Sequence, residues 1–194
     1  VGDVLIGASA TAADYNGVSK ASHIKDKLIE MMHLNETLYC CGIACSAEGS
    51  PTQSGNYQID NLLANVCKQN VTRFPYEIAR LAEDIAGGLM VTMPSEKDFE
   101  SPEVGEMCRK YFKGNSQTDV MDRMKILRLI ENMTLGTAAV GYRTESLHGA
   151  GSPQAQRIMI GRQGKLAEKQ RLAKSIAGIK VHSFIPAILL ASLC

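Results

Sequence analysis

The stretch "DVMDRMKILRLIENMTLG", residues 119–136, decides the fold class. Its apolar side chains recur three or four residues apart, which is the spacing of one face of an α-helix. These side chains are Val120, Met121, Met124, Leu127 and Ile130. Thr118 or Asp119, just before them, has a side chain suited to begin a helix. The stretch therefore predicts a helix that buries one stripe of its surface.

Helical signals between turn-forming breaks continue along most of the chain. Ser19 or Ser22 is suited to cap the second helix, and residues 47–56 form a break rich in turn residues. Pro75 should kink or interrupt the third helix, which ends at Gly87–Gly88. The expected helices span 1–16, about 19–46, 60–85, 101–113, 119–136 and 164–178.

The segment 89–99 reads as an extended connector, and Ser101-Pro102-Glu103 reads as a capped start of the next short helix. No alternating strand of useful length appears in the sequence. We therefore predict an all-α fold, an antiparallel bundle of long helices.

Length and charge narrow the class of protein. The 194 residues suit one domain, and 21 Lys+Arg against 20 Asp+Glu leave no basic surplus that would favour nucleic acid as a partner. The first residues carry no secretory signal, so we expect a cytoplasmic protein. The apolar end, "HSFIPAILLASLC", is too short to span a membrane and is broken by Pro186. It could serve partner binding or subunit packing, or be a cloning remnant.

Six cysteines lie at positions 40, 41, 45, 67, 108 and 194, and their spacing does not suggest a disulfide framework. Cys41 and Cys45 would share a helical face, with Cys40 about 100° away. Such a pair offers two metal ligands rather than four. Packing of small side chains in a helix is the favoured interpretation.

A glycine loop interrupts the helical pattern in "ESLHGAGSPQAQRIMI", residues 145–160. Ser152-Pro153 is a good helix start, and free N–H groups there could bind an anion such as a dinucleotide pyrophosphate, although a plain loop is the alternative. Glu145 and His148, three residues apart, could lie on one face of a frayed helical end and exchange a proton with a substrate, or be a solvated carboxylate and a hydrogen-bonded imidazole. Arg143 and Arg157 could hold phosphate or pair with carboxylates.

Three long strings closely resemble the C-terminal helical domain of the 4-hydroxybutyryl-CoA dehydratase (vinylacetyl-CoA Δ-isomerase) family. They are "ASHIKDKLIEMMHLNETLYCCGIACSAEG", "NYQIDNLLANVCKQNVTRFPYEIARLAEDIAGGLMVTMPSE" and "AVGYRTESLHGAGSPQAQRIMIGRQG". The resemblance covers residues 1–180, expected to form one C-terminal helical domain of a larger subunit, and leaves 181–194 as a tail that does not match. It implies a bundle similar to the C-terminal domain of acyl-CoA dehydrogenases.

The resemblance also implies a function. Members of this family are homotetramers that carry FAD and a [4Fe-4S] cluster and dehydrate 4-hydroxybutyryl-CoA to crotonyl-CoA, a lyase and isomerase chemistry of acyl-CoA substrates. The cluster ligands belong to parts of the subunit absent from this chain, so we expect no metal ligand here and little activity from the chain alone. Neither a membrane nor a nucleic acid is an expected partner.

Five site residues follow from matching the motif "TESLHGAGSPQ" to this family. Glu145 corresponds to the catalytic glutamate. The loop expected to face the flavin comprises Gly149, Ala150, Gly151 and Ser152. Two alternatives remain: the C-terminal domain of a related flavin-dependent 4-hydroxyphenylacetate 3-monooxygenase, which lacks the cluster, or a purely structural assembly module.

Overall fold

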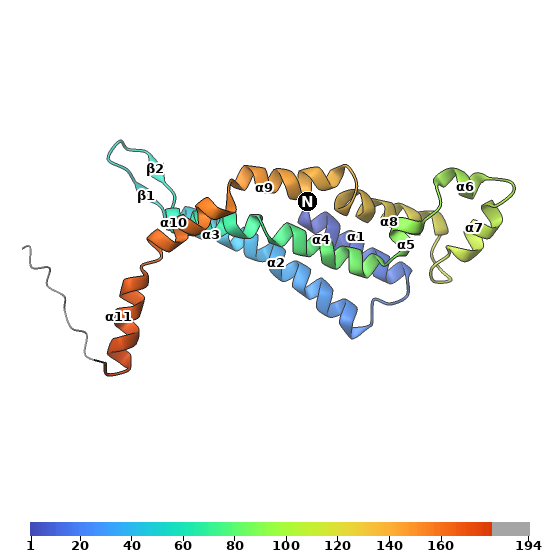
Figure 1. The fold of residues 1–194 in the computed structure, drawn as a ribbon. Coiled ribbons are helices and arrows are strands. Elements are labelled where there is room, and N and C mark those ends of the chain that lie inside the picture. The colour runs from blue at the N-terminus through green and yellow to red at the C-terminus, as the bar shows by residue number, and fades with distance from the viewer. Residues whose placement is uncertain (180–194) are drawn as a thin grey trace, which may run out of the picture.

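The computed structural model describes residues 1–179 and confirms the all-α prediction (Figure 1). Long helices lie side by side and short ones connect or extend them. In chain order the larger helices are α1 (Gly2–Tyr15), α2 (Ser22–Ala47), α3 (Asn61–Val71), α4 (Phe74–Ala86), α8 (Val120–Thr134), α10 (Pro153–Gln163) and α11 (Leu166–Ile176). The short helices are α5 (Leu89–Thr92), α6 (Glu96–Glu100), α7 (Gly105–Tyr111), the π-helix η1 (Val140–Thr144) and α9 (Glu145–Ala150).

The core forms where α1, α4 and α8 pack on one another, with α2 against α1 and α4. The predicted stripe of α8 is confirmed, because Val120, Met124, Leu127 and Ile130 are all buried. Met121 is only partly buried, at the edge of this core. Asp119 caps the helix, since its Oδ1 accepts from the amide of Met121 at 2.8 Å. Burial of this stripe fixes α8, and α8 leads directly into the segment with the predicted site.

The predicted third helix is interrupted at Pro75, as expected. α3 ends at Val71, and α4 begins at Phe74 with the proline in its first turn, where a missing amide hydrogen costs nothing. Gly87 ends α4 with a φ of 71°, a backbone conformation that suits glycine. The break at 47–56 holds a small antiparallel hairpin of β1 (Ser50–Pro51) and β2 (Tyr57–Gln58).

Two predictions about residues 89–103 are wrong. The expected extended connector contains α5 and α6, and Ser95 and Asp98 form a capping box at the start of α6. Phe99 is buried and packs edge-on against Phe112, which holds this segment on the bundle. Ser101 ends α6 instead of starting a helix, and α7 begins only at Gly105, after a turn over residues 102–104.

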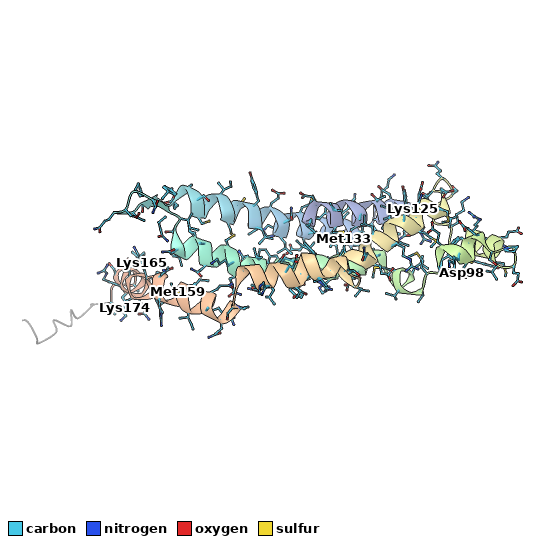
Figure 2. The ribbon with its side chains drawn as sticks, turned by 90° about the horizontal axis from the view of Figure 1, so that it is seen from above. Asp98, Lys125, Met133, Met159, Lys165 and Lys174 are labelled. Carbon is cyan, nitrogen blue, oxygen red and sulfur yellow. The ribbon has the colours of Figure 1, made fainter. Side chains whose placement is uncertain are left out.

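The two ends of the molecule carry different elements. Seen from above in Figure 2, Asp98 on α6 and Lys174 on α11 lie at opposite ends. α10 packs on α3, whereas α11 has no buried residue. The predicted tail, 181–194, lies outside the described residues. Within 1–179, none of the helices has both the length and the apolar character needed to cross a membrane.

The α8 stripe provides a test of the core. Leu127 is 1% exposed and Leu129, two residues later, is 38% exposed. We expect Leu127→Ala to lower the free energy of unfolding by about 2–5 kcal/mol, because it removes buried methyl groups and leaves a cavity. The matched change Leu129→Ala should cost less than about 1 kcal/mol. Urea denaturation followed by circular dichroism measures both, and equal losses would contradict the assigned orientation of α8.

Candidate functional site

Glu145 lies within a continuous helix that the sequence did not reveal. Residues 140–144 form the π-helix η1, and α9 follows without a break from Glu145 to Ala150. The prediction of a glycine loop over 149–152 is therefore wrong for Gly149 and Ala150, which are helical. Only Gly151 and Ser152 form the turn between α9 and α10. A π-turn adds one residue to a helical turn and is often found at functional sites.

Two contacts hold η1 against the bundle. The guanidinium of Arg143 donates to the backbone carbonyl of Thr134, at the end of α8. The same guanidinium lies over the ring of Tyr76 on α4, 5.6 Å from its centroid. Next to it, the Ser146 hydroxyl donates to the carbonyl of Tyr142 at 2.8 Å. The backbone leading into Glu145 is thus tied to both α4 and α8.

Tyr142 is the buried side chain of η1, at 7% exposure. Burial raises the pKa of its hydroxyl to about 12, because the charged form would lose its hydration. Tyr142 therefore stays protonated near neutral pH and acts as a packing residue of the π-turn rather than as a base.

Glu145 and His148 lie on the exposed surface of α9. Their spacing of three residues on a helix places them on one face, as the sequence suggested. Within residues 1–179, Glu145 forms no salt bridge. The carboxylate is thus exposed on α9 and not ion-paired within the described residues.

The turn after α9 exposes backbone. A side-chain carbon added at Gly149 would meet no atom within 4 Å, so the surface there is open. Gly151 has a φ of 85°, which favours glycine. Ser152 caps α10 as predicted, because its hydroxyl oxygen accepts from the amide of Ala155 at 3.4 Å. The four predicted flavin-facing residues are contiguous in space but divided between a helix end and a turn.

Gln156 is a functional candidate that the sequence analysis missed. It is the buried residue of α10, at 3% exposure. Its Nε2 donates to the carbonyl of Ala150 at 2.7 Å and to that of Gly151 at 3.2 Å. No pattern in the sequence marks this residue, because its burial and its two acceptors depend on how α10 packs after the turn.

Two of the three cysteines of α2, Cys41 and Cys45, lie near Cys67 of α3. Cys45 is buried and Cys40 is exposed, while burial, together with the neighbouring Cys41 and Cys45, raises the pKa of Cys67 on α3. In the described part of the chain, no cluster of three or more His, Cys, Asp or Glu side chains could hold a metal ion. Cys41, Cys45 and Cys67 lie where α2 contacts α3, as the packing interpretation predicts, whereas Cys40 does not.

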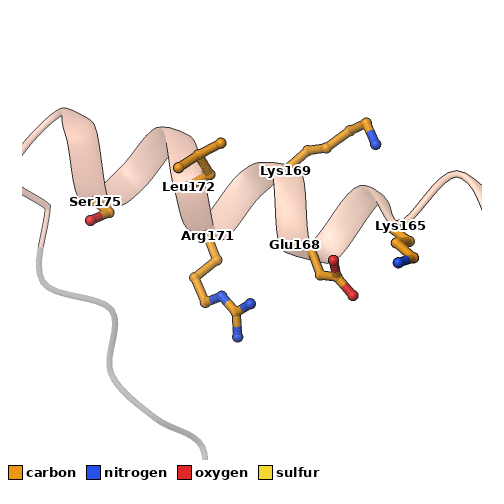
Figure 3. A pocket seen from close by; sticks show the side chains of 6 residues that line it. All are labelled: Lys165, Glu168, Lys169, Arg171, Leu172 and Ser175. Atoms are coloured by element: carbon orange, nitrogen blue, oxygen red, sulfur yellow. The ribbon is translucent and has the colours of Figure 1, made fainter.

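A surface hollow along α11 contains none of the predicted site residues. It has a volume of about 510 Å³ and is lined by Lys165, Glu168, Lys169, Arg171, Leu172 and Ser175. Figure 3 shows these side chains spread along one exposed helix. Long solvated side chains of this kind do not form an enclosed site.

Comparison with known proteins identifies the family. The family model for the C-terminal part of 4-hydroxyphenylacetate 3-hydroxylase (HpaB) matches residues 1–178, and the chain belongs to this family. Within it, the chain is 70% identical over 188 residues to the 4-hydroxybutyryl-CoA dehydratase/vinylacetyl-CoA-Delta-isomerase of Clostridium aminobutyricum. That match covers 93% of this chain and 38% of the relative, which confirms the resemblance found in the sequence.

Solved structures support the same assignment. An oxygen-tolerant archaeal 4-hydroxybutyryl-CoA dehydratase from N. maritimus matches with a TM-score of 0.86 and 66% identity, over 93% of this chain and 36% of that one. The oxygenase component HpaB, solved with FAD and 4-hydroxyphenylacetate, matches with a TM-score of 0.78 and 20% identity, over 91% of this chain and 37% of that one. The second match shows a shared fold. The chain spans less than two fifths of the curated relative and of both solved chains.

Burial of Tyr142 makes stability depend on pH. Since its folded pKa, about 12, exceeds the ordinary value of 10.0, its contribution is complete below pH 10 and is lost as the pH rises towards 12. In this range the free energy of unfolding of the unaltered chain should fall by up to about 1.4 kcal/mol per pH unit because of Tyr142. We expect Tyr142→Phe to remove this part of the fall. Thermal unfolding between pH 9 and pH 12 measures the difference from the unaltered chain. The exposed Tyr111→Phe is the control, and identical pH profiles for both variants would contradict the burial of Tyr142.

Proposed function

We propose that this chain is the C-terminal helical part of a subunit that dehydrates 4-hydroxybutyryl-CoA to crotonyl-CoA and isomerises vinylacetyl-CoA. The 70% identity to the clostridial dehydratase/isomerase carries this proposal. In the proposed subunit, residues 1–180 form one domain and other polypeptide supplies the remaining walls of the site. We further propose that the assembled enzyme is a cytoplasmic homotetramer.

Glu145 would transfer a proton to or from the bound acyl-CoA. Its carboxylate is exposed in this chain and forms no ion pair with the described residues. Contact with further polypeptide or with a substrate would therefore break no existing ion pair. Covering by the remaining polypeptide would exclude water from the carboxylate, which suits a group that exchanges a proton directly with a bound substrate. The contacts of Arg143 with the Thr134 carbonyl and the Tyr76 ring would hold the helix that carries the carboxylate in place during this step.

The turn after α9 fits the approach of a flat ring such as the FAD isoalloxazine. Open space at Gly149 and the side-chain-free Gly151 let a planar group come close to the backbone. Ala150 and Ser152 complete this surface with small side chains. When bound, the flavin would supply one-electron oxidation and reduction of the substrate. The residues of the chain would bind the ring and orient the substrate between it and Glu145.

The [4Fe-4S] cluster of the proposed enzyme does not fit the residues described. They provide no group of three or more metal-ligating side chains, and Cys45 is buried in a helix contact. The proposal therefore assigns all cluster ligands to other polypeptide of the subunit, and no step is assigned to the cluster from this chain.

Exposed apolar side chains on α2 support the proposed assembly. Ile29, Met32, Tyr39 and Ile43 are each about half exposed or more and fall on one face of the helix. Apolar patches of this kind on a protein surface mark contacts with other protein. In the proposed tetramer they would face another domain or subunit.

The role of Glu145 is tested in a complete subunit. Because this chain is 70% identical to its clostridial relative, a chimera can join the unmatched part of that relative to residues 1–179. We expect Glu145→Gln to lower kcat for crotonyl-CoA formation by about 100-fold or more, since an amide cannot exchange the proton. Anaerobic turnover assays measure this loss, and sedimentation checks the assembly.

The exposed Glu103→Gln is the matched control and should leave kcat within about twofold. Unchanged turnover in Glu145→Gln would remove Glu145 from the mechanism. A parent enzyme that hydroxylates a phenol with reduced flavin and oxygen, and is inert on 4-hydroxybutyryl-CoA, would replace the proposal with the monooxygenase alternative.

A further inference from the structure

Gln156 joins the start of α10 to the end of α9. Its side chain is 97% buried in a helix whose neighbouring positions, Ala155 and Arg157, are exposed. Nε2 donates to two successive carbonyls, those of Ala150 and Gly151, at 2.7 and 3.2 Å. One amide group thereby fixes two adjacent peptide units of the turn.

Only a double donor satisfies this arrangement. Rotating the amide by half a turn would place Oε1 against two carbonyl oxygens, so the orientation of Gln156 is determined by its surroundings. Oε1 itself is buried and accepts no hydrogen bond from the described residues. Glutamate has the same shape but at most one donor, when protonated, and methionine has similar bulk and no donor. This side chain therefore acts through the two hydrogen bonds that its Nε2 donates.

The tie formed by the two hydrogen bonds of Gln156 determines the direction of the backbone N–H of Ser152. In a trans peptide the C=O and N–H directions are opposite, and the described part of the chain has no cis bond. Since the Gly151 carbonyl is drawn inwards to Gln156, the N–H of Ser152 points outwards. Within residues 1–179 no acceptor receives it. Gly151, at a φ of 85°, would otherwise let this peptide turn over easily.

We propose that Gln156 is a positioning residue that locks the Gly151–Ser152 peptide so that the Ser152 N–H donates to the flavin. This inference rests on the proposed function. A fixed donor needs no reorganisation when the ring gains charge, and such preorganised dipoles stabilise charge that develops on a bound group. Gln156 itself would not touch the flavin.

The test uses the chimeric subunit with Gln156→Met and Gln156→Glu. Without the tie we expect amide exchange in the peptide that spans 147–155 to quicken at least tenfold in the flavin-free protein. We also expect the Kd for FAD to rise at least tenfold and the flavin reduction potential to fall. Hydrogen-exchange mass spectrometry, fluorescence titration with FAD and anaerobic redox titration provide the three readouts.

Gln154→Glu is the matched control, because it adds the same charge two residues away at an exposed position. It should match the parent in exchange, and faster exchange there would assign the effect to charge alone and overturn the inference. If Gln156→Glu does not fold, Gln156→Met carries the test. Parent-like exchange and FAD affinity in the Gln156→Met variant would overturn the role of Gln156 and leave the proposed function standing. If exchange quickens in the Gln156→Met variant but the parent itself binds no FAD, the proposed function is contradicted instead.

Discussion

Packing of the α8 stripe against α1 and α4 is the constraint on which the rest of the structure depends. It fixes the end of α8, where the Thr134 carbonyl receives Arg143, and thereby the start of the helix that carries Glu145. Tyr142 fills the space beside this contact. From there, α9, the turn at Gly151 and α10 follow in order. Gln156 on α10 donates hydrogen bonds back to the carbonyls of Ala150 and Gly151. Each part of the site takes its position from the bundle.

Sequence patterns predicted what depends on local signals. The α8 stripe, the interruption at Pro75, the end of α4 at Gly87 and the Ser152 cap all follow from residues within one or two turns of each other. Helix 138–150 escaped prediction because Gly141 and Gly149 lower its local helix propensity, while tertiary contacts of Tyr142 and Arg143 stabilise it. The donors of Gln156 are likewise visible only when α9 and α10 are placed together.

The chemistry and the way the chain could present it are indicated by different features. The motif around Glu145 and the matched relatives point to the chemistry, whereas the exposed carboxylate and the open surface at Gly149 explain how one part of a subunit could present it. In the proposed subunit the chain would provide one hydrogen-bonded wall of the site. An enclosed cavity would require polypeptide beyond the two fifths or less of the relatives that this chain matches.

The central claim is that this wall faces a flavin and an acyl-CoA in the complete enzyme. A structure of the full subunit, solved with FAD and a substrate analogue, tests it most directly. The account predicts that the Glu145 carboxylate is shielded from solvent and lies about 2.6–3.2 Å from a reacting atom, or one water away. A structure in which Glu145 remains on the outer surface of the assembly, with the flavin bound against other elements, would contradict it.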